Sequence, residues 1–149
     1  MPLDKTSAQN PYKSAISTLP DLILDTLESN DLNEIKNTIL QKSSGFPNLV
    51  CELGCGSGGH MHECAKICAD TFYFGFEMRF KRIFKSAEKA KLANLKNICV
   101  LRANAKDISS YFAQESLNGV YVNFPDPWER RRWTKHRMLN EESQKTIFQ

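Results

Sequence analysis

Apolar and polar positions divide most of the chain into short segments of alternating type. Apolar runs of strand length, bounded by turn or charged residues, lie at residues 48–53, 71–77, 97–103 and 117–124. Helical spacing of apolar residues lies between them, at residues 61–69, 78–95 and 105–112. Strict alternation of strand and helix predicts parallel βαβ units with helices on both faces of one sheet. The predicted fold class is therefore α/β, a doubly wound, Rossmann-like parallel sheet.

The first 47 residues do not follow this alternation and are expected to form a helical N-terminal appendage. One helix is predicted to start at Asp21, and a second at Asp31, which has Glu34 in capping-box spacing. The sequence "SSGFPN" then breaks the chain before the first strong strand. The predicted domain division is an appendage over residues 1–47 and a main domain over residues 48–149.

Composition indicates a globular protein and places basic charge near the C-terminus. Of the 149 residues, 41% are hydrophobic and 25% charged, and the net charge is +3. Residues 129–137 carry five basic side chains against one acidic side chain, so the rest of the chain sums to −1. This distribution assigns the basic character to that one segment.

The sequence contains no apolar run near the roughly 20 residues that span a bilayer, and its start does not resemble a signal peptide. We therefore expect a cytoplasmic protein without membrane contact. Its five cysteines are expected to be reduced thiols. They are spaced four apart at Cys51 and Cys55 and at Cys64 and Cys68, unlike the shorter C-x-x-C knuckles of zinc sites, so no metal is expected.

A glycine-rich turn follows the first strong strand in "CELGCGSGGH". Glycines permit positive φ and close approach of a ligand to the backbone. The helix that begins after the turn directs free N–H groups toward that ligand. Glu77, at the end of the next strand, lies where a carboxylate accepts hydrogen bonds from ribose hydroxyls. The turn is therefore a candidate nucleoside site.

Two cofactors are compatible with this turn. Gly54, Gly56 and Gly59 satisfy the dinucleotide pattern G-x-G-x-x-G, which indicates NAD(P) and an oxidoreductase. Glu52, Gly54, Gly56 and Gly58 satisfy E-x-G-x-G-x-G, the loop of enzymes that use S-adenosylmethionine. Glu52 favours the second interpretation, because a carboxylate there would repel a pyrophosphate and could lie near a cationic methionine group.

A second unusual stretch is "NFPDPWERRRWTKHR", at the end of the last strand. Pro125 and Pro127 fix the backbone on either side of Asp126, at the sheet edge where ligands bind in open α/β folds. The basic residues after Trp128 can neutralise phosphates. This stretch predicts a nucleic-acid contact beside an active-site carboxylate.

Together, "ELGCGSG", "FGFE" and "NFPDPW" in this order resemble the bacterial tRNA (guanine-N7)-methyltransferases, over residues 49 to about 139. The resemblance implies a class I methyltransferase fold that uses S-adenosylmethionine. It also implies transfer of a methyl group to N7 of a variable-loop guanine in tRNA, at position 46. Compared with that family, the chain is expected to be truncated at its C-terminus, with the last strands missing.

The resemblance also implies residue roles. Asp126 is the expected catalytic residue. The expected cofactor-binding residues are Glu52, Gly54, Gly56, Gly58, Glu77, Asn104 and Asp126. The expected substrate or RNA-binding residues are Asn123, Trp128, Arg130, Arg131, Arg132, Lys135 and Arg137. Asn104 stands where the family usually has aspartate, so cofactor binding is expected to be somewhat weaker.

Two alternatives to an active tRNA methyltransferase stay open at this point. The chain could be a non-catalytic fragment that binds RNA through the basic segment. It could also be an NAD(P)-dependent oxidoreductase that uses the G-x-G-x-x-G pattern. The sequence does not indicate an oligomeric state.

Replacement of Arg131 and Arg132 by alanine is expected to weaken tRNA binding and to flatten its dependence on salt, because two phosphate contacts are lost. Binding titrations at several salt concentrations measure both effects. An unchanged salt slope would argue against an RNA-binding role for this segment.

Overall fold

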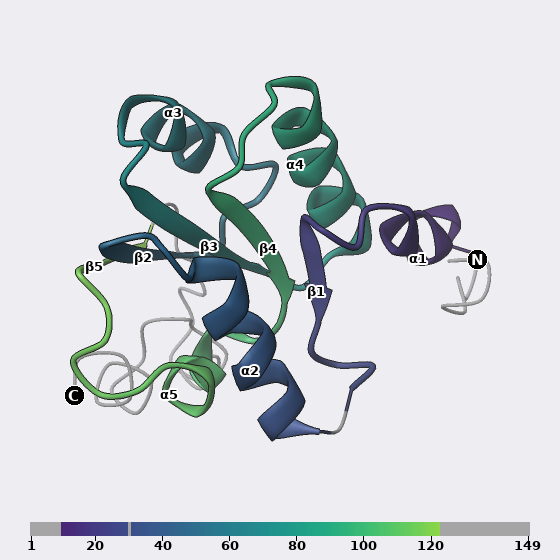
Figure 1. The fold of residues 1–149 in the computed structure, drawn as a ribbon. Coiled ribbons are helices and arrows are strands. Elements are labelled where there is room, and N and C mark those ends of the chain that lie inside the picture. The colour runs from purple at the N-terminus through teal and green to yellow at the C-terminus, as the bar shows by residue number, and fades with distance from the viewer. Residues whose placement is uncertain (1–9, 30, 123–149) are drawn as a thin grey trace, which may run out of the picture.

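The computed structural model describes residues 10–29 and 31–122, which form a parallel sheet covered by helices on both faces (Figure 1). Its strands are β1 (Ile23–Asp25), β2 (Asn48–Leu53), β3 (Thr71–Glu77), β4 (Ile98–Arg102) and β5 (Gly119–Val122). They are arranged in the order β1-β4-β3-β2-β5, and each neighbouring pair is parallel. The predicted doubly wound α/β class is confirmed.

The helices divide between the two faces of the sheet. They are α1 (Pro11–Ala15), α2 (Leu32–Ser43), α3 (Gly59–Ile67), α4 (Phe80–Leu92) and α5 (Ile108–Tyr111), with 3₁₀ turns at Ile16–Thr18 and Ala105–Asp107. One face is covered by α3 and α4, with α1 packed against α4, and the other face is covered by α2 and α5 (Figure 1). This arrangement has three layers, with the sheet in the middle.

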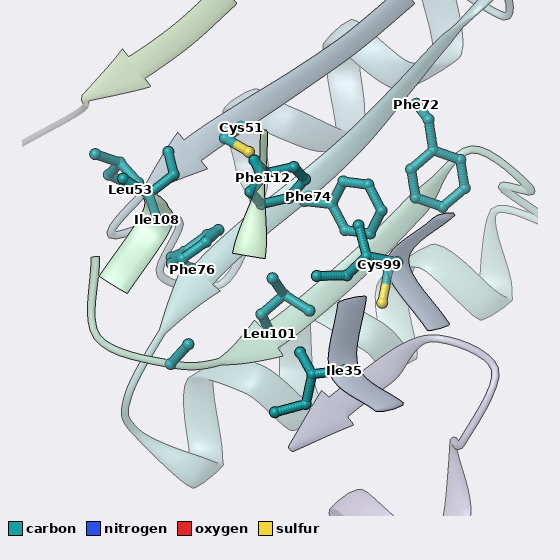
Figure 2. Close-up of a cluster of buried hydrophobic side chains, with 12 residues drawn as sticks. Ile35, Cys51, Leu53, Phe72, Phe74, Phe76, Cys99, Leu101, Ile108 and Phe112 are labelled. Carbon is teal, nitrogen blue, oxygen red and sulfur yellow. The ribbon is translucent and has the colours of Figure 1, made fainter. Parts of the chain in front are cut away.

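The central strand β3 is buried along its whole length, which explains why its sequence is an apolar run without polar alternation. Phe72, Phe74 and Phe76 point toward α2 and α5, and Figure 2 shows Phe74 and Phe76 beside Phe112. The rings of Phe74 and Phe112 meet edge to face, with centroids 5.3 Å apart. Side chains alternate across a strand, so Tyr73 contributes to the core on the opposite face.

The prediction of a helix that starts at Asp21 is wrong, because residues 23–25 form strand β1. The backbone N–H of Val100 donates to the carbonyl oxygen of Leu22 at 2.8 Å. The guanidinium of Arg102 donates to Asp25 Oδ1, also at 2.8 Å. Val100 and Arg102 both lie on β4, about 80 residues away along the chain. Pairing with this distant strand therefore overrides the local helix signal.

The second predicted N-terminal helix is confirmed as α2. The carboxylate of Asp31 accepts a hydrogen bond from the backbone N–H of Glu34 at 3.1 Å, which caps the helix. Since β1 lies within the sheet, the N-terminal segment contributes to the main fold. The division of the chain at residue 47 stays a prediction.

Within residues 10–29 and 31–122, no helix has the length and apolarity needed to cross a bilayer.

Burial separates the five free cysteines into two classes. Cys51, Cys55 and Cys99 are buried, whereas Cys64 and Cys68 are half-buried. Desolvation raises the pKa of the Cys99 thiol to about 12 and raises the pKa of Cys51 and Cys55 as well, because the interior disfavours the thiolate. At Cys55 the charges of Glu77 and Glu52 raise the pKa further.

We therefore expect a maleimide at pH 8 to label Cys64 and Cys68 in the folded chain, and to label the three buried thiols only after unfolding. Peptide mass spectrometry identifies the labelled sites, and the same reaction in guanidinium chloride serves as the control. Labelling of Cys99 in the folded chain as fast as labelling of Cys68 would contradict the described core.

Candidate functional site

Three predicted site residues lie at the carboxyl ends of neighbouring strands. Glu52 is the penultimate residue of β2, Glu77 is the last residue of β3, and Asn104 follows β4. In open parallel sheets, ligands bind at this edge. Glu52 is only 3% exposed and Glu77 is 9% exposed. The structure therefore places two buried carboxylates at this edge on adjacent strands, offset by two residues because Glu52 pairs with Gly75.

The glycine loop joins β2 to α3 at the same edge. Gly54, Gly56 and Gly58 have φ values of +67°, +57° and +83°, a region that side chains rarely adopt. The backbone N–H of Cys55 donates to the carbonyl of Phe76 at 3.0 Å, which extends the pairing with β3 into the loop. A methyl group added at Gly56 would meet no atom of the described residues within 4 Å, so among these residues there is open space beside the loop.

Glu77 connects the loop to the start of α4. Its Oε2 atom accepts a hydrogen bond from the backbone N–H of Gly56 at 3.1 Å. Its Oε1 atom accepts from the N–H groups of Met78 and Arg79 at 3.1 and 3.2 Å. A carboxylate offers about four lone-pair sites, so one acceptor direction stays available for a hydroxyl. A second hydroxyl would have to share or replace a backbone donor.

Glu52 lies on the face of the sheet covered by α3. Its Oε2 atom is 3.6 Å from Nδ1 of His60, and the His60 ring meets Tyr121 of β5 edge to face at 5.1 Å between centroids. His60 and Tyr121 are both partly exposed, so they form the rim above the buried carboxylate. No pattern in the sequence indicates this contact between α3 and β5.

His62 is a further residue that the sequence analysis did not assign to the site. Its Nε2 atom is 2.7 Å from the carbonyl oxygen of Ser86 in α4, and its Nδ1 atom contacts the carbonyl oxygen of Gly58. The ring is buried and links the glycine loop to the neighbouring helix. A histidine at a helix start has no distinctive pattern, so only the fold reveals this role.

Asn104 is exposed and partly engaged by its own turn. Its Oδ1 atom accepts a hydrogen bond from the backbone N–H of Lys106 at 3.0 Å, which caps the 3₁₀ turn. The carboxamide nitrogen is the group of this side chain that donates. This arrangement suits a ligand acceptor better than a ligand donor.

The remaining predicted site residues lie outside the described part of the chain. They are Asn123, Asp126, Trp128, Arg130, Arg131, Arg132, Lys135 and Arg137. Val122, at the end of β5, precedes them, and β5 ends at the same sheet edge as β2 and β3. Their roles stay predictions.

The described residues favour an organic ligand with hydroxyl groups and positive charge. Two buried carboxylates supply acceptors and negative potential, and the loop leaves room for close approach. Across residues 10–29 and 31–122 no group of three or more His, Cys, Asp or Glu side chains could hold a metal ion.

A parallel sheet with a glycine loop after one strand and a carboxylate at the end of the next defines the class of nucleoside-binding α/β proteins. Comparison with known proteins narrows this class. The family described as "Putative methyltransferase" matches residues 47–149, and the chain belongs to this methyltransferase family.

Individual relatives agree with the family. A tRNA (guanine-N(7)-)-methyltransferase of Clostridioides difficile is 32% identical over 74% of this chain and 52% of its own length. A bifunctional glycosyltransferase/methyltransferase of Fusobacterium nucleatum is 29% identical over 95% of this chain and 21% of its own length. The chain thus spans about half the length of the first of these curated relatives, and about a fifth of the second.

Solved structures show the same fold. The aminoglycoside resistance methyltransferase NpmB1 superposes with a TM-score of 0.59 at 27% identity, over 75% of this chain and 54% of its own. The resemblance to the tRNA (guanine-N7)-methyltransferases noted from the sequence motifs is confirmed.

Gly56 and Gly58 provide a matched test of the loop. Alanine at Gly56 is expected to cost about 1 kcal/mol, the penalty of a left-handed residue. Alanine at Gly58 would add overlap with the His62 ring and the Ser86 hydroxyl, so we expect a loss of roughly 2–4 kcal/mol. Urea unfolding followed by circular dichroism measures both losses, and equal values would contradict the packing of His62 under the loop.

Proposed function

We propose that the chain carries the cofactor-binding part of a tRNA (guanine-N7)-methyltransferase that uses S-adenosylmethionine. The observation that carries the proposal is the pair of buried carboxylates, Glu52 and Glu77, beside a glycine loop in a chain of a methyltransferase family. The tRNA substrate and the N7 position are those named for the Clostridioides difficile relative. A tRNA substrate would place the protein in the cytoplasm.

The described residues fit this cofactor. Glu77 would accept a hydrogen bond from a ribose hydroxyl, and Asn104 would contact the adenine edge. Glu52, which is buried beside His60 at the start of α3, would stabilise the cationic methionine end. The same carboxylate would repel the pyrophosphate of NAD, so the charge of the site favours the sulfonium cofactor. When bound, S-adenosylmethionine supplies an electrophilic methyl group.

The chemistry on the guanine needs little from the protein beyond positioning. Guanine N7 carries a lone pair and no proton, so no general base has to remove one. The entropic gain from holding N7 in line with the methyl group is the main contribution. Positive charge appears on the purine as the methyl group arrives, so Asp126 is proposed to stabilise it electrostatically. Asn123 and Trp128 are proposed to hold and stack the base.

The basic residues from Arg130 to Arg137 are proposed to bind the tRNA backbone. Each can neutralise a phosphate and release counterions, which supplies affinity without sequence specificity. Recognition of the variable-loop guanine at position 46 would then depend on the shape of the tRNA and on the residues around Asp126.

A methyl-transfer assay tests the proposal. The chain is incubated with labelled S-adenosylmethionine and a tRNA transcript, and nucleosides from the digested tRNA are identified by mass spectrometry. We expect 7-methylguanosine, and its loss when the target guanine is replaced by 7-deazaguanine, which lacks the N7 lone pair.

Two ligand titrations separate the alternatives. Binding of S-adenosylhomocysteine without binding of NAD would exclude the oxidoreductase, and the opposite result would overturn the proposal. Binding of tRNA and S-adenosylhomocysteine without any 7-methylguanosine would indicate an RNA-binding part that does not catalyse alone.

A further inference from the structure

A second concentration of positive charge lies on α4, in addition to the C-terminal segment. Between residues 79 and 91 the sequence has six basic side chains and one acidic side chain, a net charge of +5. The sequence analysis had assigned the basic character to residues 129–137, whose net charge is +4. That assignment is wrong, because α4 is as basic as the C-terminal segment. The charge of α4 is hidden in the net charge of the chain because acidic residues elsewhere cancel it.

The helix gathers four of these cations on one side. Lys81, Arg82, Lys85 and Lys89 fall within an arc of about 100° at 100° per residue, and extend over about 12 Å of helix. We call these four residues the basic stripe. The apolar residues Ile83, Ala87 and Ala90 are fully buried against the sheet. The stripe therefore faces away from the core, on the outer side of α4.

Little within the described chain neutralises the stripe. Lys85 lies 3.6 Å from Glu88, in a pair whose side chains are both more than 40% exposed, and such pairs contribute little. Arg82 and Lys89 form no ion pair with a described residue. Helix α3 differs in its balance of charge, because it carries one lysine and one glutamate, Lys66 and Glu63, which lie 3.1 Å apart. The stripe is thus unlike the mixed charge of an ordinary solvated helix.

The start of α4 also carries charge of the unfavourable sign. Lys81 and Arg82 lie in the first turn, where the helix dipole is positive, and no acidic residue lies in that turn. Cations at this end destabilise a helix by roughly 0.3–1 kcal/mol each. A local conflict of this kind is expected where function requires it. An anionic partner would remove it.

The stripe starts at the edge of the sheet that holds the cofactor site, since α4 follows Glu77 directly. Strand β5 also ends at that edge. In the order β1-β4-β3-β2-β5, β4, on which α4 packs, lies three strands from β5, a distance of about 14 Å. A folded RNA seated over the site can contact both sides.

We propose that the basic stripe is a second tRNA-binding surface, which contacts phosphates on the side of the cofactor site away from β5. This inference rests on the proposed function, because it takes the polyanion to be the tRNA substrate. The charge density, the absence of described counter-charges for Arg82 and Lys89, and the conflict with the helix dipole all favour a phosphate backbone as the partner.

The test compares two double variants of equal charge change. Arg82→Gln with Lys89→Gln removes two cations of the stripe. Lys36→Gln with Lys96→Gln removes two exposed lysines from α2 and from the loop after α4. Binding of tRNA is measured by fluorescence anisotropy between 50 and 200 mM salt, approximately the range over which phosphate contacts dominate. Binding of S-adenosylhomocysteine is measured on the same samples to show that the site is folded.

We expect the stripe variant to bind tRNA about tenfold more weakly at low salt, with a salt slope reduced by roughly 1.4–1.8, while the control variant changes little. Both variants should bind S-adenosylhomocysteine like the unaltered chain. Equal tRNA affinities and equal salt slopes in the two variants would overturn the tRNA-binding role of the stripe and leave the proposed function intact. Failure of the unaltered chain to bind tRNA would overturn both.

Discussion

The hydrogen bonds of the Glu77 carboxylate are the interaction on which the site depends. One oxygen accepts a hydrogen bond from the backbone N–H of Gly56 in the glycine loop. The other accepts from the backbone N–H groups of Met78 and Arg79, which lie just before α4. A buried carboxylate without such donors would cost several kcal/mol. The side chain can therefore stay buried at the end of β3 only because the loop and the helix start both converge on it.

This arrangement makes the scaffold and the ligand compete for the same oxygens. Three of about four lone-pair directions are already used by backbone donors. A nucleoside that binds by its ribose would complete the set with one hydroxyl and would have to share a donor for the other. Ligand binding and loop geometry are thus coupled through one side chain, with His62 fixing the opposite end of the loop against α4.

The sequence could predict the parts of this structure that depend on local pattern. Strands β2 to β5, the capped helix α2 and the glycine loop follow from apolar runs, an Asp–Glu capping pair and positive-φ glycines. Strand β1 could not be predicted, because its partner on β4 is about 80 residues away. The contacts of His60 with Glu52 and Tyr121 join three separate elements, and no spacing in the chain encodes them.

The distribution of charge was missed for a different physical reason. A net charge is a sum, and acidic residues on other elements cancel the cations of α4 in that sum. The helix brings Lys81, Arg82, Lys85 and Lys89 to one side. Only this arrangement makes their charges add to a positive electrostatic potential on one surface of the protein. The edge of the sheet then has negative carboxylates inside and cations outside. A cationic small molecule and a polyanion are the ligands for which such a division of charge is favourable, and a methyl donor with an RNA acceptor is one such pair.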